Sequence, residues 1–335
     1  MKRYLLTIHL LILMLPCKMA AAVLVGDVNG DGDVNMADAA FLEQCITTPS
    51  LYYGGVDYVD LGLPSGLLWA SANVGATSPE GYGEHYAWGE LATKDNYAWA
   101  TYKWGTSATT LTKYCTSSSS GTVDNLSTLQ PVDDVAHTST DCGWHIPSID
   151  DWLELEKYCT MSSGFSKGTS GYYVISKQNW DRIFLPYSGY SSVDYIYDED
   201  YDACYWANDL YALNTATAYG YYIGSSNHFW AYRPRYLGNP VRPVIYSYET
   251  VCDLDGDGLV TNADLHALIK RLWIPGDADD DGSVTLSDLS AISKHILGTE
   301  VVSTFNKYNA DVNMDGLVNI VDLSVVTKIM LDKTR

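Results

Sequence analysis

The pattern of apolar and polar positions along the chain contains one unit that occurs four times. Each copy is a polar stretch of twelve residues, followed by apolar residues at positions 13, 16 and 20 of the unit. Spacings of three and four place side chains on one face of a helix. We therefore predict four short helices, each with one apolar stripe. The stripes are Ala39/Leu42/Ile46, Leu265/Leu268/Leu272, Leu289/Ile292/Ile296 and Leu323/Val326/Met330.

Residues 51–248 follow a different pattern, with short apolar runs separated by Gly, Ser, Pro and Asn. Runs at 58–63 and 67–70, on either side of a Pro-Ser-Gly turn, predict a β-hairpin. A helix should begin after Ser148, because Asp151 three residues later completes a capping-box-like start. Further strands are predicted at 171–176, 183–185, 203–207, 216–223 and 240–245. We expect an α+β fold that is rich in sheet and loops.

The N-terminus has the pattern of a secretory signal peptide over residues 1–22. Lys2 and Arg3 precede an apolar run, and Ala20–Ala22 supply small residues for cleavage. The run is shorter than the roughly 20 residues that span a bilayer, and no later stretch is longer. We therefore expect a secreted or cell-surface protein without a transmembrane segment. Cys17 is an alternative site of lipid attachment, but Pro16 stands where a small residue is usual, which favours simple cleavage.

The charge of the chain bears on its possible partners, and its cysteine content bears on possible disulfides. The chain has 41 Asp and Glu against 20 Lys and Arg, a formal net charge of −21, and 47% hydrophobic residues. An acidic surface disfavours nucleic acid, whose phosphates require basic side chains. Six cysteines follow Cys17, so an exported chain could hold buried thiols or one or two disulfides. Sequence leaves both alternatives open.

The polar part of each repeat has the spacing of a calcium-binding loop, Asp-x-Asp/Asn-x-Asp-Gly-x-Val-Asn/Thr-x-x-Asp. Side-chain oxygens at positions 1, 3, 5 and 12, with the backbone carbonyl of position 7, can surround Ca²⁺, and Gly at position 6 allows the sharp turn. We predict up to four Ca²⁺ ions. Their ligands are Asp27, Asn29, Asp31, Asp33 and Asp38; Asp253, Asp255, Asp257, Leu259 and Asp264; Asp277, Asp279, Asp281, Ser283 and Asp288; and Asp311, Asn313, Asp315, Leu317 and Asp322. These loops hold 16 of the 41 acidic residues and no Lys or Arg.

The repeats depart from an ordinary EF-hand because position 12 is Asp instead of Glu and the preceding segments 21–25 and 244–251 look extended. A calcium loop with only an outgoing helix resembles the repeat of dockerin type I domains. The resemblance is strongest over 276–331, where two loops start 34 residues apart. It implies a paired domain that binds a cohesin module of another protein through positions 10, 11, 17 and 18. The corresponding residues singled out here are Leu286, Ser287, Lys294, Ile320, Val321 and Lys328.

Two repeats remain, at 23–50 and 251–275, and neither can bury its apolar stripe alone. They could pair with each other across residues 51–248, as an inserted domain would allow. Cys45 and Cys252 would then be neighbours and could form a bridge. Alternatively, the second repeat could pack onto the C-terminal pair, residues 276–335, as an array of three.

The central segment, residues 51–248, resembles the Fibrobacter succinogenes major paralogous domain. The resemblance rests on runs such as Val59-Asp-Leu-Gly-Leu, Leu68-Trp-Ala-Ser-Ala-Asn-Val-Gly-Ala, Cys142-Gly-Trp-His-Ile-Pro-Ser and Val241-Arg-Pro-Val. It implies a fold like that of C-type lectins and no established activity. Trp206-Ala-Asn208-Asp209 is faintly similar to the calcium and sugar motif of those lectins.

No nucleophile-elbow, zinc-protease or phosphate-loop motif occurs in the chain, so no catalytic residue is assigned. Glycoside hydrolysis is the reaction class that paired carboxylates would serve if an activity existed. We expect an exported, non-catalytic modular protein. Its calcium-binding dockerin would dock to a cohesin-type partner and place a lectin-like domain on the cell surface or in a polysaccharide-degrading assembly. The alternative is a carbohydrate-binding or glycosidase-associated module whose calcium repeats are purely structural.

Overall fold

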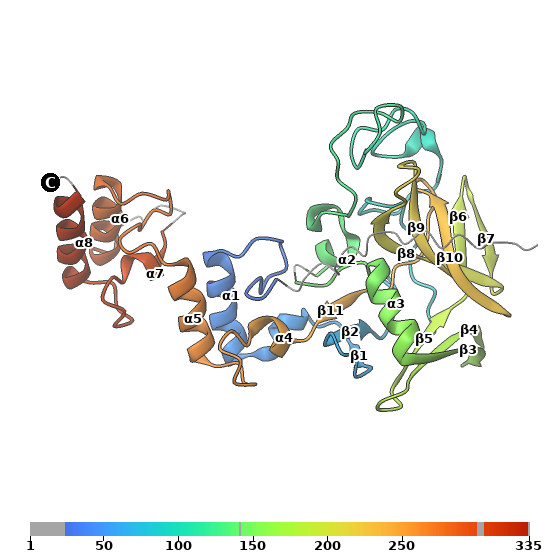
Figure 1. Cartoon of the computed structure of the whole chain (residues 1–335), viewed down its shortest axis with the longest axis horizontal. Helices are drawn as coiled ribbons and strands as arrows, with labels where there is room; N and C mark the ends of the chain where they lie inside the picture. Colours follow the sequence, from blue (N-terminus) through green and yellow to red (C-terminus); the bar gives the residue numbers. More distant parts are fainter. Residues whose placement is uncertain (1–23, 141, 300–304, 334–335) are drawn as a thin grey trace, which may run out of the picture.

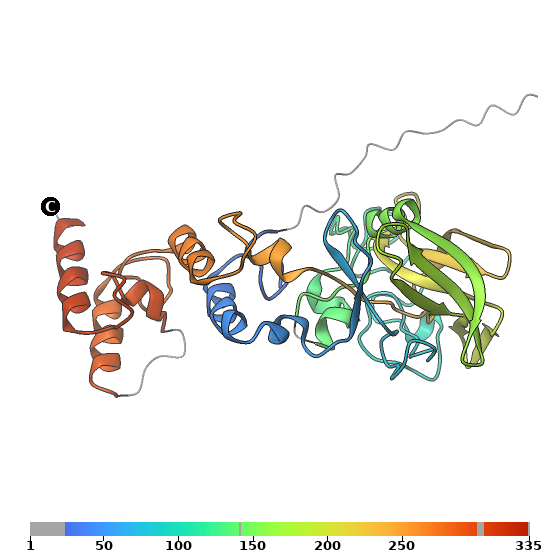
Figure 2. The ribbon, with the colours of Figure 1, turned by 90° about the horizontal axis from the view of Figure 1, so that it is seen from below.

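The computed structural model describes residues 24–140, 142–299 and 305–333. Figures 1 and 2 show three bodies in a row: the C-terminal helices, a middle pair of helices, and a larger body that carries the sheets. The predicted signal peptide and Cys17 lie outside the described residues. Within the described part, no helix is long and apolar enough to cross a membrane.

The described chain mixes helices and strands, as the α+β prediction expects. The α-helices are α1 (Met36–Thr47), α2 (Val135–Thr138), α3 (Ile149–Tyr158), α4 (Tyr248–Cys252), α5 (Asn262–Leu272), α6 (Leu286–Ile296), α7 (Lys307–Ala310) and α8 (Ile320–Lys333). The 3₁₀ helices are η1 (Pro49–Tyr53), η2 (Trp99–Thr101) and η3 (Pro131–Asp133). The strands are β1 (Tyr58–Asp60), β2 (Leu67–Ala70), β3 (Cys159–Ser166), β4 (Thr169–Ser176), β5 (Arg182–Pro186), β6 (Ser188–Ser192), β7 (Tyr195–Glu199), β8 (Asp202–Leu210), β9 (Thr217–Gly224), β10 (Asn227–Pro234) and β11 (Val244–Tyr246).

The central body contains three sheets, ordered β1-β2-β11, β10-β9-β8-β6-β7 and β3-β4-β5. Neighbouring strands run antiparallel, except that β6 and β8 are parallel. Helix α3 supplies Trp152 to the shared core, where its ring stacks on Tyr221 of β9 at 4.6 Å and meets Trp69 of β2 edge-on at 4.8 Å. These aromatic contacts join two of the sheets to one helix. The third sheet contributes Val174 of β4 to the same core.

The predicted hairpin and the predicted helix are both confirmed. β1 pairs with β2, and Asp151 accepts a hydrogen bond from the Ser148 backbone amide while its own amide donates to the Ser148 hydroxyl. The sequence did not reveal β3, β6, β7 and β10. β7 is exposed along its whole length, so it lacks the alternation of apolar and polar positions that marks a half-buried strand.

The expectation of an extended chain over 244–251 is wrong in its second half. β11 ends at Tyr246, and the short helix α4 then leads into the second of the four predicted calcium loops. Ser247 caps this helix by accepting a hydrogen bond from the Thr250 amide at 3.3 Å. A similar short helix, α7, precedes the fourth loop, with the Asn306 side chain as its cap.

The helices of the first and second repeats lie side by side (Figures 1 and 2). Leu42 of α1 and Leu268 of α5 are fully buried in one apolar cluster that also contains Cys45 and Cys252. This is the arrangement in which the two repeats pair across the central segment. Helices α6 and α8 instead share a separate cluster with Ile292 and Val326. Cys45 and Cys252 are buried as free thiols, and burial is the main cause that raises their pKa values.

One buried histidine gives the central body a specific pH dependence. His85 is 7% exposed, and its Nδ1 lies 2.7 Å from the Ser191 hydroxyl. Burial lowers its pKa from 6.5 to about 4. The unfolded chain therefore takes up this proton first, and stability present above pH 6.5 is lost as the pH falls towards about 4. The loss should approach about 3 kcal/mol.

Replacing His85 by Asn keeps a polar group near Ser191 and removes the titration. Denaturant unfolding of wild type and His85→Asn at pH 7 and pH 4.5 should show a smaller loss of stability for the variant. Equal losses in the two proteins would exclude His85 as the source.

Candidate calcium sites

One hydrogen bond across the turn is common to all four loops. The carboxylate at position 1 accepts from the backbone amide of the glycine at position 6. The donor and acceptor pairs are Gly32 to Asp27 at 3.0 Å, Gly258 to Asp253 at 2.8 Å, Gly282 to Asp277 at 3.0 Å and Gly316 to Asp311 at 2.7 Å. These glycines have φ between 83° and 94°, a backbone conformation that residues with a Cβ rarely adopt.

The carboxylate at position 5 makes the second shared contact, because it accepts from the backbone amide of position 7. The pairs are Asp33 to Asp31 at 2.9 Å, Leu259 to Asp257 at 2.8 Å, Ser283 to Asp281 at 2.8 Å and Leu317 to Asp315 at 2.9 Å. The loop therefore curls around its own acidic side chains. Position 7, whose carbonyl is a predicted ligand, stays attached to position 5 in every copy.

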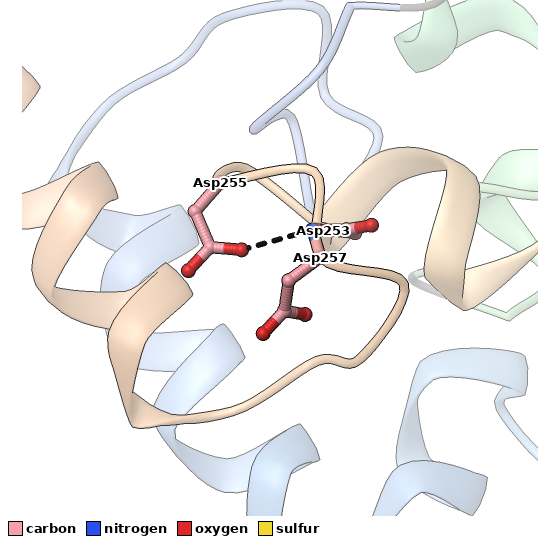
Figure 3. Close-up of side chains that lie close together, drawn as sticks. All are labelled: Asp253, Asp255 and Asp257. Atoms are coloured by element: carbon pink, nitrogen blue, oxygen red, sulfur yellow. Dashed lines mark hydrogen bonds between the residues drawn. The ribbon is translucent and has the colours of Figure 1, made fainter.

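Two of the loops bring three carboxylates close together. One oxygen from each of Asp253, Asp255 and Asp257 lies within 4.8 Å of the others, and the same holds for Asp277, Asp279 and Asp281. Figure 3 shows the first group on one turn of the chain, where the Asp257 amide donates to Asp255 at 3.2 Å. Three mutually repelling carboxylates at this distance suit a divalent cation that prefers oxygen ligands.

In the first and fourth loops, position 3 is an asparagine and makes a different contact. Its side-chain oxygen accepts from the amide of position 5, and its NH₂ group donates to the position-5 carboxylate. The NH₂ contacts are Asn29 to Asp31 at 3.0 Å and Asn313 to Asp315 at 2.9 Å. An amide oxygen remains a suitable calcium ligand, with one negative charge fewer in the loop.

Buried carboxylate oxygens provide a test of whether a cation fits. Among the described residues, Oδ1 of Asp27 and Oδ1 of Asp279 are buried without a hydrogen-bond partner. Burial, and then the charge of Asp38, raises the pKa of Asp27 to about 6, and burial also raises the pKa of Asp277. Unpaired buried carboxylate oxygens are costly unless a cation compensates them. The donor set, which consists only of oxygens, fits Ca²⁺.

The aspartate at position 12 is fully buried in every loop and does two things at once. One oxygen accepts from the amide of position 2, closing the loop, in the pairs Val28 to Asp38 at 2.8 Å, Leu254 to Asp264 at 2.8 Å, Ala278 to Asp288 at 2.7 Å and Val312 to Asp322 at 3.0 Å. The other accepts from position 9, in the pairs Asn35 to Asp38 at 2.8 Å, Thr261 to Asp264 at 2.7 Å, Thr285 to Asp288 at 2.6 Å and Asn319 to Asp322 at 2.9 Å. Asp therefore suits this position because its short side chain stays within reach of both amides.

The residues at position 9 are functional positions that the sequence reading missed. They cap the outgoing helices through their side chains, and they are Asn35, Thr261, Thr285 and Asn319. The signal was present, because Ser, Thr or Asn followed three residues later by an acid is a capping box. Each calcium loop and its helix therefore form one hydrogen-bonded unit.

The third loop offers a test that separates the role in calcium binding from the role in folding. Asp281 is exposed and accepts from the Ser283 amide, whereas buried Asp288 accepts from three backbone amides. Asp281→Asn should weaken calcium binding and leave the calcium-free loop almost unchanged. Asp288→Asn replaces an acceptor by a donor facing an amide, and should destabilise the loop by about 1–3 kcal/mol even in EGTA.

Hydrogen exchange at the Ala278 and Thr285 amides, measured by mass spectrometry on the full chain with and without calcium, reads out the two effects. In EGTA, these amides should exchange faster than in wild type only in Asp288→Asn. Equal exchange rates of the two variants in EGTA would contradict the proposal that Asp288 holds both the loop and the start of the helix.

Comparison with known protein families adds an independent finding. Residues 275–331, which include the third and fourth loops with α6, α7 and most of α8, match the dockerin type I domain. No curated protein and no solved structure matches the chain. Dockerin type I domains bind calcium, in agreement with the oxygen ligands of these two loops. The C-terminal part of the chain, residues 275–331, is a dockerin type I domain.

Proposed function

We propose that the chain is an exported, non-catalytic modular protein whose dockerin type I domain docks to a cohesin-type partner in the presence of calcium. The observation that carries this proposal is an exposed group of apolar residues at the start of α6 and α8. Leu286 is 74% exposed, Ile320 is 66% exposed and Val321 is 50% exposed. Large apolar side chains that remain in water at a helix start mark an interaction site.

The other predicted contact residues, Ser287, Lys294 and Lys328, are exposed as well. The opposite sides of the two helices are occupied, because Ala291, Ile292 and Val326 form the buried cluster between them. Packing therefore leaves the predicted partner-binding positions available to a second protein.

Calcium would control this surface through the capping residues. Leu286 directly follows Thr285, whose amide donates to Asp288 of the third loop at 2.6 Å. Ile320 follows Asn319, whose amide donates to Asp322 of the fourth loop at 2.9 Å. The first predicted contact residue of each helix therefore directly follows a residue whose backbone amide is hydrogen-bonded to the loop.

We extend the calcium proposal to all four loops, with the ligands predicted from the sequence. The four loops share their main hydrogen bonds, including those of positions 1, 5 and 12. Calcium supplies a divalent positive charge among carboxylates that otherwise repel one another. The first and second loops would form a second pair of dockerin-like repeats, which flank the central segment.

The division of the chain and its location belong to the same proposal. We assign residues 1–22 to a signal peptide, 23–50 and 251–275 to the flanking repeats, 51–248 to a lectin-like domain of the Fibrobacter succinogenes major paralogous type, and 276–335 to the dockerin pair. Docking would then place the central domain on the cell surface or in a polysaccharide-degrading assembly.

A carbohydrate-binding role for the central domain is the alternative. Exposed tyrosines support it, because Tyr195 is 63% exposed and Tyr201 is 77% exposed. The segment that is similar to the lectin motif speaks against a lectin-type site. Trp206 is fully buried and donates to the Tyr86 carbonyl at 2.7 Å, and Asp209 accepts from the Ile149 amide at 3.0 Å.

Substitution of the exposed pair on α8 tests the docking proposal. Ile320→Ala together with Val321→Ala should weaken binding to immobilised type I cohesin modules at least tenfold, because burying each aliphatic side chain at an interface is worth about 1.5–3 kcal/mol. Leu213→Ala, which removes an 84% exposed side chain from the central segment, is the matched control.

Biolayer interferometry with calcium and with EDTA gives the measurement. Wild type and Leu213→Ala should bind only with calcium. Binding that survives chelation, or a double variant that binds as tightly as the control, would contradict the proposal.

A further inference from the structure

We propose that the first and second repeats form a calcium-operated clasp, which closes the two ends of the central domain and transmits calcium occupancy to it. The clasp is defined here as residues 24–47 together with 249–272. The inference rests on the proposed function in one respect only, that the first two loops bind calcium. It is independent of any cohesin partner.

Direct bonds join the two halves of the clasp. The Gly26 amide donates to the Val251 carbonyl at 3.0 Å, and Arg271 donates to the Val25 carbonyl at 3.2 Å. Between them, α1 and α5 bury Leu42 and Leu268 completely. Segments separated by the whole central domain are therefore held side by side.

A cluster of tyrosines continues the clasp into the central domain. The Tyr52 hydroxyl donates to the Tyr246 carbonyl at 3.1 Å, and the Tyr248 amide donates to the Tyr53 hydroxyl at 3.2 Å. The rings of Tyr52 and Tyr248 lie 5.3 Å apart. The same apolar cluster includes Trp144 of the central domain, so one continuous core spans the clasp and the domain.

The first loop alone, among the four, has its turn glycines against the central domain. A Cβ on Gly30 would lie 2.3 Å from the Cα of Gly143, and a Cβ on Gly32 would lie 3.8 Å from Pro131. Within the described residues, nothing lies within 4 Å of the corresponding point on the turn glycines of the other loops, which are Gly256, Gly258, Gly282 and Gly316. The close approach to Gly143 leaves no room for a side chain at position 4 of the first loop.

The candidate ligand Asp27 also faces the central domain. It lines a cavity of about 270 Å³ together with Asp134, His145 and Asp151 of that domain. Without calcium, Asp27 and the other carboxylates of the loop repel one another, and the loop must loosen to separate them. A loosened loop cannot keep its contact with Gly143.

Coupling follows by mass action. Calcium that binds only the closed clasp stabilises every state in which the clasp is closed, including the folded central domain. Loss of calcium from these two loops should therefore lower the thermal stability of the central domain. The third and fourth loops have no such contact with the central domain in the described structure. The dockerin pair meets the clasp instead, where Glu43 of α1 accepts hydrogen bonds from Lys307 and Tyr308. Calcium in the third and fourth loops should therefore affect the central domain much less than calcium in the clasp.

Tryptophan fluorescence of the full chain isolates the central domain, because all tryptophans except Trp273 lie within residues 51–248. Position 5 offers matched variants, with Asp31→Ala plus Asp257→Ala in the clasp and Asp281→Ala plus Asp315→Ala in the dockerin. Calcium should raise the midpoint of the tryptophan transition by about 5 °C or more in wild type and in the dockerin variant. The clasp variant should lose this shift.

A clasp variant that retains the calcium shift, or a dockerin variant that loses it, would overturn the proposal. A second pair of variants covers the case in which the clasp variant fails to fold. Gly30→Ala and Gly256→Ala occupy the same loop position with φ of 75° and 77°, and only the first meets Gly143. Gly30→Ala should reduce the calcium shift by at least half, and Gly256→Ala should reduce it much less; equal reductions would contradict coupling through Gly143.

Cohesin binding by the same proteins separates failure of this inference from failure of the proposed function. If calcium does not change the midpoint of the tryptophan transition while cohesin binding persists, the clasp proposal is wrong and the docking proposal is supported. A calcium-dependent midpoint without docking supports the clasp and rejects the docking.

Discussion

The buried carboxylate at position 12 organises each of the four loops and the helix that follows it. It closes the loop through the amide of position 2 and starts the following helix through the amide of position 9. Three amides on Asp38 do not offset its burial, which still raises the pKa of this carboxyl group. The same negative charge that organises the loop therefore favours a cation beside it, so calcium binding at such a loop would be coupled to the placement of its helix.

The two pairs of loops share this hydrogen bonding, but their helices have different surroundings. In the C-terminal dockerin type I domain, the helices leave apolar residues exposed at their starts, where a partner can bind. In the other pair, the helices pack against each other and share an apolar cluster with the central domain. The chain would then use calcium for an external contact at one end and for an internal contact in the middle. Much of its acidity has this origin, because 16 of 41 acidic residues lie in the four loops.

The loops and the outgoing helices could be predicted because their chemistry fixes residue types at fixed spacings. The sequence could not decide between the two packings of the second repeat. An apolar stripe such as Leu265/Leu268/Leu272 requires a packing partner, but its pattern does not identify that partner. The contact of Gly30 with Gly143 has no sequence signal either, since a glycine has no side chain whose type could indicate what it packs against. Strand β7 could not be predicted, because both of its faces are exposed and its sequence therefore lacks the apolar–polar alternation of a half-buried strand.

We propose calcium sites in all four loops, including the two that lie outside the matched dockerin domain. The decisive measurement is isothermal titration of the full chain with calcium after complete removal of bound metal. We expect about four ions per chain, with position-5 variants of the first and second loops each removing one. Saturation at two ions, lost only with variants of the third and fourth loops, would contradict the claim.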